Sequence, residues 1–163
     1  MKIGVVSDTH GRGIPAQLIN EFKGVELIIH AGDFCAAKDL KIFTDLKEVK
    51  AVYGNMDESA LQKKLPEKII FKLADCTVGV YHGEGPPQKI LDAVRAEFKE
   101  DKIDAVVFGH SHIPFNKSID GILFFNPGAP NDTVCAPYCS YGILEIDGKK
   151  ISGKIIKVKD GYG

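Results

Sequence analysis

The chain has 163 residues, of which 44% are hydrophobic and 26% are charged, and its formal net charge is −1. This composition is that of a globular domain and excludes a disordered or fibrous chain. The balanced charge argues against long nucleic acid as a partner, because polyanions are bound by basic surfaces. The apolar runs are too short for a transmembrane helix, and no signal segment stands at the N-terminus. We therefore expect a single cytoplasmic domain over residues 1–163, with its four scattered cysteines as reduced thiols.

Short β-rich runs alternate with helical patterns in the first half of the chain. The runs are apolar at consecutive positions, as in strands that are buried on both faces of a parallel sheet. The predicted strands are Lys2–Val6, Glu26–His30 and Val49–Tyr53. Helices are predicted after Pro15, over Ala36–Leu46 and from Pro86 onward. The alternation predicts parallel strands with right-handed crossovers.

The second half of the chain is dominated by strands with short turns. A hairpin is predicted from Ile69–Leu73 and Thr77–Tyr81, and Asp147-Gly148 marks another turn. The other predicted strands are Ala105–Phe108, Ile122–Phe125, Tyr141–Ile146 and Ile151–Val158. Strands joined by short turns pair antiparallel, so we predict an α/β fold. Its form would be a four-layer α/β/β/α sandwich, with two mixed sheets packed face to face and flanking helices.

Polar residues beside glycine follow five of these strands. They occur in Ser7-Asp8-Thr9-His10, Gly32-Asp33, Gly54-Asn55, His82-Gly83 and Gly109-His110-Ser111-His112. In α/β sheets, ligands bind at the carboxyl ends of the strands, so we expect these five segments to meet in one site. The candidate ligands are Asp8, His10, Asp33, Asn55, His82, His110 and His112.

A single four- or five-coordinate metal ion cannot use all seven of these nitrogen and oxygen ligands. Two ions that share a bridging carboxylate can use them all. The imidazole-rich set favours Mn, Ni, Fe, Co or Zn over Ca or Mg. Two divalent ions, two carboxylates and a hydroxide sum to a positive charge, which favours a phosphate substrate. A lone histidine is more often structural, and His30 is interpreted in that way.

The five segments together resemble the motif series of the calcineurin-like metallophosphoesterases. The resemblance extends to Asn126-Pro127-Gly128, and the short length resembles the small YfcE-type phosphodiesterase branch. It implies the same sandwich fold, and it implies that Asp33 bridges two ions. One ion would be held by Asp8, His10, Asp33 and His112, and the other by Asp33, Asn55, His82 and His110.

The resemblance also implies a mechanism, namely in-line attack on phosphorus by a hydroxide that bridges the two ions. The catalytic residues would be Asp33, Asn55 and His82, and Asn55 would also orient the substrate phosphate. Many members of the family carry a histidine directly after the asparagine, and Met56 stands there in this chain. A thioether cannot protonate a leaving group, so activated or cyclic phosphodiesters are expected as substrates rather than alkyl monoesters.

Other interpretations remain open. A non-catalytic protein-interaction scaffold on the same fold is the main alternative, since a retromer subunit is built in this way. A nucleotide or nucleic-acid phosphohydrolase is another. Arg12 is a candidate for substrate binding, although an arginine in such a loop is more often a solvated surface residue. The expected partner is a small phosphoester, with no membrane, and the sequence leaves a homo-oligomer open.

Overall fold

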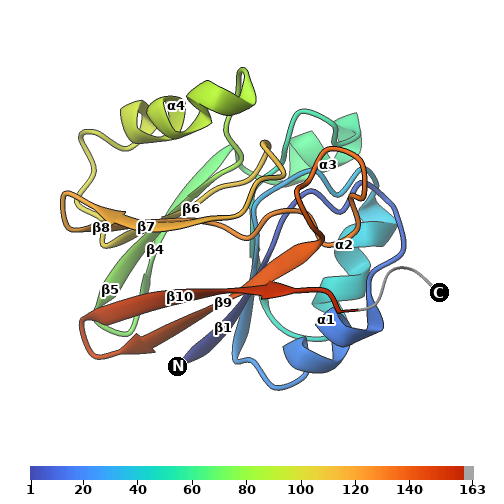
Figure 1. Cartoon of the computed structure of the whole chain (residues 1–163), viewed down its shortest axis with the longest axis horizontal. Helices are drawn as coiled ribbons and strands as arrows, with labels where there is room; N and C mark the ends of the chain where they lie inside the picture. Colours follow the sequence, from blue (N-terminus) through green and yellow to red (C-terminus); the bar gives the residue numbers. More distant parts are fainter. Residues whose placement is uncertain (160–163) are drawn as a thin grey trace.

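The computed structural model describes residues 1–159 as two five-stranded sheets that lie face to face, with helices on both outer sides (Figure 1). The first sheet has the strand order β10-β9-β1-β2-β3. Its strands are β1 (Lys2–Val6), β2 (Leu27–His30), β3 (Val49–Ala51), β9 (Ser140–Asp147) and β10 (Lys150–Lys157). The second sheet has the order β4-β5-β6-β8-β7. Its strands are β4 (Lys68–Leu73), β5 (Cys76–Tyr81), β6 (Ala105–Val107), β7 (Phe115–Ile119) and β8 (Ile122–Asn126).

Both sheets are mixed. β1, β2 and β3 pair parallel to one another, and β9 pairs antiparallel with β1 and β10. In the second sheet β5, β6 and β8 run parallel, whereas β4 and β7 pair antiparallel at the two edges. The carboxyl ends of β1, β2 and β3 therefore share one edge of the first sheet, and those of β5, β6 and β8 share one edge of the second.

Three apolar clusters fill the three interfaces of the sandwich. The cluster between the sheets includes Val5 and Ile29 on one side and Val80 and Val107 on the other. A second cluster packs α1 (Ala16–Phe22), α2 (Ala37–Thr44) and α3 (Ser59–Lys64) on the outer face of the first sheet. The third packs α4 (Ile90–Glu97), which follows the short helix η1 (Pro87–Lys89), on the second sheet. The predicted four-layer sandwich is confirmed.

The element boundaries differ from the prediction in a few places. The third strand ends at Ala51 instead of Tyr53, and the second helix covers Ala37–Thr44 instead of Ala36–Leu46. The prediction missed β7 and α3. β7 is an edge strand whose middle residues are polar and exposed, and α3 has six residues with only Leu61 buried. Neither segment has the regular spacing of apolar residues on which a sequence-based prediction of strands and helices depends.

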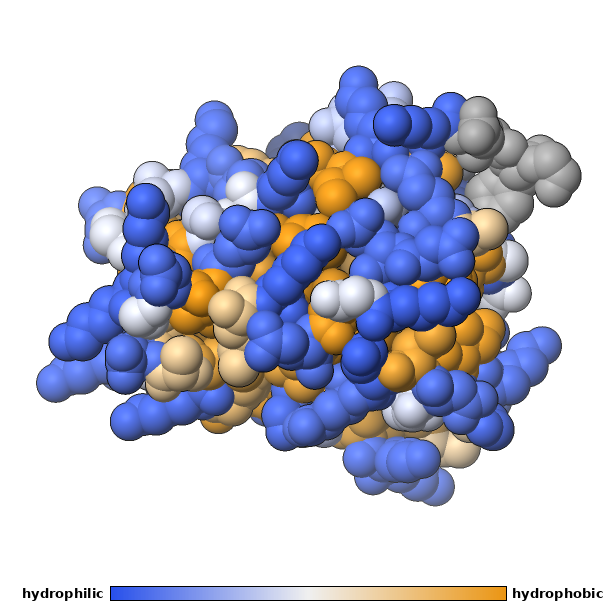
Figure 2. Space-filling view, turned by 90° about the horizontal axis from the view of Figure 1, so that it is seen from below, coloured by the Kyte–Doolittle hydropathy of each residue, from blue (hydrophilic) through white to orange (hydrophobic). Residues whose placement is uncertain are grey.

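The side of the molecule opposite α4 is largely hydrophilic, with hydrophobic residues showing between the charged side chains (Figure 2). None of the helices within residues 1–159 combines the length and the apolar character required to cross a membrane.

Candidate metal centre

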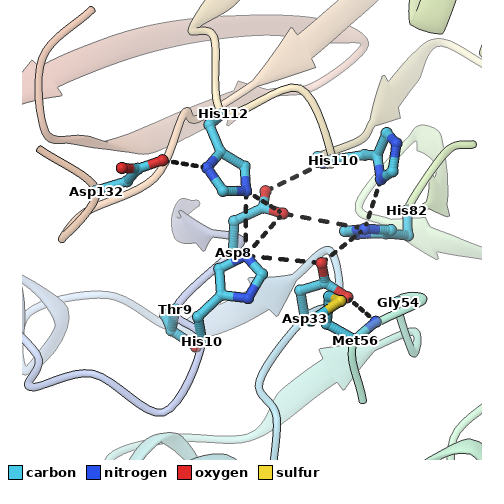
Figure 3. Close-up of polar contacts among 12 residues, drawn as sticks. Asp8, Thr9, His10, Asp33, Gly54, Met56, His82, His110, His112 and Asp132 are labelled. Atoms are coloured by element: carbon cyan, nitrogen blue, oxygen red, sulfur yellow. Dashed lines mark hydrogen bonds and ion pairs between the residues drawn. The ribbon is translucent and has the colours of Figure 1, made fainter. Parts of the chain in front are cut away.

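The segments that follow β1, β2, β3, β5 and β6 meet at one end of the sandwich, where the carboxyl ends of these strands lie. The two central loops are joined by their backbones, since the N–H groups of Asp8 and His10 donate to the carbonyls of Gly32 and Asp33 at 3.0 and 2.9 Å. A Cβ atom at Gly54 would lie 2.7 Å from the Asp33 nitrogen, so only glycine permits this approach of the β3 loop. All seven predicted ligands are brought to this one place. Figure 3 labels all of them except Asn55, which is placed by its contacts with His82 and His110.

The backbone at these ligands is strained. Five of the seven have positive φ values without being glycine: Asp8 (57°), His10 (50°), Asp33 (59°), His110 (68°) and His112 (58°). Each such residue costs roughly 1–2 kcal/mol relative to an ordinary backbone conformation. Strain of this kind persists where surrounding contacts enforce it, and it is typical of functional sites.

One group of potential ligand atoms is formed by Asp8, His10 and His112, which lie within 4.8 Å of one another. The Nε2 atoms of the two imidazoles are 3.1 Å apart. Asp8 Oδ1 lies 3.8 Å from His10 Nε2 and 3.3 Å from His112 Nε2. Two ring nitrogens and a carboxylate oxygen that face one another are a suitable set for a divalent transition-metal ion.

The second group contains Asp33 and His82, together with Asp8, again within 4.8 Å. Asp33 Oδ2 is 3.3 Å from His82 Nε2 and 3.7 Å from His10 Nε2. Asn55 Oδ1 lies 3.2 Å from His82 Nε2 and 3.1 Å from His110 Nδ1, so these residues extend the group on its far side. Asp33 therefore lies between imidazoles of both groups.

Two observations show that these residues fit a metal ion. Asp8 is fully buried, and its Oδ1 atom has no hydrogen-bond partner within the described part of the chain, although it faces three imidazoles. Such an orphaned carboxylate oxygen is costly unless a cation pairs with it. In addition, three histidines each donate one ring N–H to an oxygen acceptor. The other nitrogen of each ring faces the remaining ligands and is left to bind a metal ion. These bonds run from His82 to the Ala31 carbonyl, from His110 to the Gly85 carbonyl and from His112 to Asp132.

The protonation equilibria indicate a site that attracts cations. Burial acts to lower the pKa of His82 and of His112, but the neighbouring carboxylates outweigh it and raise each pKa to about 9. Burial likewise acts to raise the pKa of Asp8, and the imidazoles His112 and His82 outweigh it, so that this pKa is lowered. Asp8 thus remains charged and His82 and His112 hold protons, whereas burial lowers the pKa of His10. Divalent ions bind such sites by displacing these protons.

Asp132 is a site residue that the sequence analysis missed. Its carboxylate accepts the Nδ1–H of His112 and the backbone N–H groups of Val134 and Cys135 at 2.9 and 3.0 Å. These bonds hold the pKa of Asp132 well below its usual range, even though burial acts in the opposite direction. A carboxylate behind an imidazole fixes which ring nitrogen carries the proton. Asp132 stands in a loop without a motif, so sequence spacing offered no signal for it.

Three other residues singled out in the sequence have distinct positions. His30 is fully buried, accepts the Gly32 N–H at Nδ1 and stacks on Phe34 at 3.5 Å, which agrees with the structural interpretation. The side chain of Arg12 is 54% exposed and lies 3.8 Å from Asp132 Oδ1. The side chain of Met56 is exposed, and its backbone N–H donates to Asp33 Oδ1 at 2.8 Å.

Comparison with known protein families gives a match over residues 1–149 to the calcineurin-like phosphoesterase superfamily domain. The chain belongs to this superfamily. A probable metallophosphoesterase from Methanothermobacter thermautotrophicus is 35% identical over 162 residues, which cover 96% of this chain and 92% of that protein.

Solved structures of other proteins have the same fold. An archaeal phosphodiesterase is 28% identical, with a TM-score of 0.75 and coverage of 96% of this chain and 100% of that chain. Vacuolar protein sorting 29 from Cryptosporidium parvum has a TM-score of 0.83, with 99% and 93% coverage, but only 18% identity. The second similarity shows the shared sandwich fold and nothing more about function. The solved structures that resemble this chain therefore include one of a phosphodiesterase.

Proposed function

We propose that this calcineurin-like protein is a phosphodiesterase that depends on two divalent metal ions, with Mn, Ni, Fe, Co and Zn as the candidate metals. The observation that carries the proposal is the buried, unpartnered Asp8 Oδ1 atom, which faces three imidazoles inside a ring of seven potential ligands. The 28% identity to an archaeal phosphodiesterase over nearly the whole chain supports a diester as the substrate.

We assign the ligands to two sites that share Asp33. Asp8, His10, Asp33 and His112 form one site, and Asp33, Asn55, His82 and His110 form the other. The position of Asp33 Oδ2, 3.7 Å from His10 Nε2 and 3.3 Å from His82 Nε2, supports the bridging role. Bound divalent ions supply Lewis-acid activation of water and of the phosphoryl oxygens.

The chain itself binds and orients the phosphate through Asn55. Because Asn55 Oδ1 is turned toward His82 and His110, its amide N–H₂ group is directed to the other side. This group forms no hydrogen bond to any residue within 1–159, and Asn55 is exposed. It is therefore available to donate to a phosphate oxygen. Arg12 is half-exposed near Asp132 and offers a second, more distant positive charge to the substrate.

The residue next to Asn55 cannot supply a proton to the leaving group. Met56 occupies the place next to Asn55, and its thioether has no proton to give. Its backbone N–H instead fixes Asp33. Esters with good leaving groups need no such proton, so activated or cyclic diesters are the preferred substrates in this proposal.

We also propose that residues 1–163 act as one domain in the cytoplasm. The superfamily match over residues 1–149 supports one domain, and the four cysteines, all free thiols, suit a reducing compartment.

The proposal is tested with bis(p-nitrophenyl) phosphate and p-nitrophenyl phosphate, each with added Mn, Ni or Zn. We expect faster hydrolysis of the diester, no activity after chelation, and loss of activity in Asp33→Ala. Metal analysis of the same samples separates the alternatives. A protein that binds two ions tightly but hydrolyses neither ester would support a scaffold instead of an enzyme.

A further inference from the structure

A small recess lies beside the metal centre, next to the ends of β3 and β5. Its volume is about 110 Å³, and it shares Asn55 and His82 with the metal centre. The other side chains that line it are two tyrosines and two glutamates, namely Tyr53, Glu67, Tyr81 and Glu84. We refer to these four residues as the tyrosine recess. The proposed hydrolysis leaves all four without a role.

Tyr81 is the deepest of the four. It is the last residue of β5, and only 7% of it is exposed. Its hydroxyl group forms no hydrogen bond with any residue in the described range. The hydroxyl oxygen is not fully enclosed by protein atoms. Tyr81 lines the recess, so its side chain can contact a molecule bound there. A nearly buried phenol without a protein partner is unusual, because buried tyrosines generally have one.

The tyrosine recess is also negatively charged. Glu67 and Glu84 are exposed, and neither forms an ion pair with another residue between 1 and 159. A second phosphate or other anion is repelled from such a recess, whereas a cation is attracted.

We propose that the tyrosine recess binds a positively charged ester group, an alcohol that carries an ammonium, while the phosphate of the same diester lies at Asn55 and the metal centre. The assignment of the phosphate rests on the proposed function. Because Asn55 borders both places, a substituent of the phosphate needs only a short chain to reach the recess. Aromatic rings together with carboxylates are a common environment for ammonium groups, which they attract through cation–π and charge interactions.

The first test uses the metal-free protein and a cation without phosphate. Choline is titrated against 3,3-dimethylbutanol, which has the same shape but carries carbon in place of the charged nitrogen. We expect the tyrosine ring signals of Tyr53 and Tyr81 in NMR spectra to move with choline and to stay in place with the neutral alcohol. Tyr53→Phe and Tyr81→Phe assign these signals. Equal responses to the two alcohols, or none to choline, would overturn the proposal.

The second test compares two esters with the same leaving group on the metal-loaded protein. They are the p-nitrophenyl esters of phosphocholine and of 3,3-dimethylbutyl phosphate. Water attacks phosphorus, p-nitrophenolate leaves, and the choline or dimethylbutyl phosphate remains. We expect kcat/KM to be about tenfold higher for the choline ester. The ratio should fall toward one in Glu67→Gln and Glu84→Gln, and it should not change in Glu100→Gln, an exposed glutamate outside the recess.

The two tests separate the recess from the proposed function. Hydrolysis of both esters at equal rates, or a ratio that neither glutamate variant reduces, refutes a cation site while the phosphodiesterase stands. If neither ester is hydrolysed, the proposed function is lost, and the choline titration of the metal-free protein then decides alone whether the recess binds cations.

Discussion

The orientation of His112 depends on one carboxylate. Asp132 accepts the Nδ1–H of this imidazole, so Nε2, 3.3 Å from Asp8 Oδ1, is the nitrogen that gives up its proton when an ion binds. The same carboxylate is held by the backbone N–H groups of Val134 and Cys135, and it therefore cannot turn away from the ring. The metal centre thus depends on a loop that contributes none of its proposed ligands.

For Asp132→Asn we expect weaker binding at one of the two proposed metal sites. The amide can still accept the backbone bonds, but its N–H₂ group would face His112 Nδ1 and move the ring proton to Nε2, the ligand atom. Changes of this kind typically reduce metal affinity about 10- to 100-fold. Calorimetric titration with Mn or Zn measures this loss.

A matched control for this variant is Asp104→Asn. Asp104 also accepts a backbone N–H, from Thr77 at 2.7 Å, and it is exposed. We expect unchanged metal binding in this control. Asp132→Asn with the full affinity at both sites would show that the carboxylate does not orient His112.

Under the proposed mechanism, Met56 determines how strongly the rate of hydrolysis depends on the leaving group. General acid assistance is typically worth 10²- to 10⁴-fold, and a thioether supplies none. We therefore expect the rate to fall steeply as the leaving-group pKa rises across a series of aryl and alkyl phosphodiesters. Met56→His should gain on the alkyl esters and change little on nitrophenyl esters, and Met56→Leu should follow the original protein throughout.

The size of this gain is limited by Asp57. This buried carboxylate would be the nearest support for a new imidazole, but it already accepts the N–H groups of Asp33, Gly54 and Cys35 at 2.7–3.1 Å. A poorly held histidine should give about tenfold, well below the usual range for a general acid. A flat leaving-group series in the original protein would mean that another group already donates the proton.

At the scale of the elements, the contact between β5 and α4 leaves no room for an added side-chain atom. Gly79 of β5 faces the Phe98 ring that follows α4, and a Cβ atom there would overlap the ring, with the Phe98 Cζ atom 2.9 Å away. Phe98 is 3% exposed and belongs to the cluster beneath α4, so it has little space to move. The missing side chain of Gly79 therefore determines how closely the helix lies on the sheet.

Gly79→Ala should lower the free energy of unfolding by about 1–3 kcal/mol, the usual cost of overpacking. Adding Phe98→Leu should recover part of this loss by removing ring atoms. Gly24→Ala, at a site with no contact closer than 3.5 Å, should have an effect within about 0.5 kcal/mol. Urea unfolding curves measure all three. Equal stability of Gly79→Ala and the original protein would contradict the tight contact.

The elements also show which parts of the structure can be predicted from sequence. β1, β2 and β5 were predictable because consecutive apolar residues mark strands buried on both faces, and polar residues beside glycine then mark their ends. β7 was not predictable, since Asn116, Lys117 and Ser118 are exposed on an edge strand. In the site, the histidines could be predicted because they stand beside glycine directly after predicted strands. Asp132 acts through a tertiary contact 20 residues away from His112, which local pattern cannot reveal.

The candidate metal centre draws its residues from both sheets of the molecule. Asp8 and Asp33 follow strands of the first sheet, whereas His82, His110 and His112 follow strands of the second. Without a cation, the buried Asp8 Oδ1 atom has no hydrogen-bond partner within residues 1–159, and the His10 and His112 rings face each other with their Nε2 atoms 3.1 Å apart. A bound ion would neutralise the carboxylates of the first sheet and bind imidazoles of the second.

Removal of the ions should therefore destabilise the whole sandwich as well as abolish hydrolysis. A ligand present at a thousandfold excess over its Kd stabilises the folded state by about 4 kcal/mol. For a chain of this size, that corresponds to a Tm lower by roughly 10 °C after chelation. Added Mn or Ni should restore both Tm and diester hydrolysis, and Asp33→Ala should show a much smaller response of Tm to either metal. Calorimetric scans with and without chelator measure the shift. An unchanged Tm together with full activity in metal-free protein would refute a metal centre that joins the two sheets.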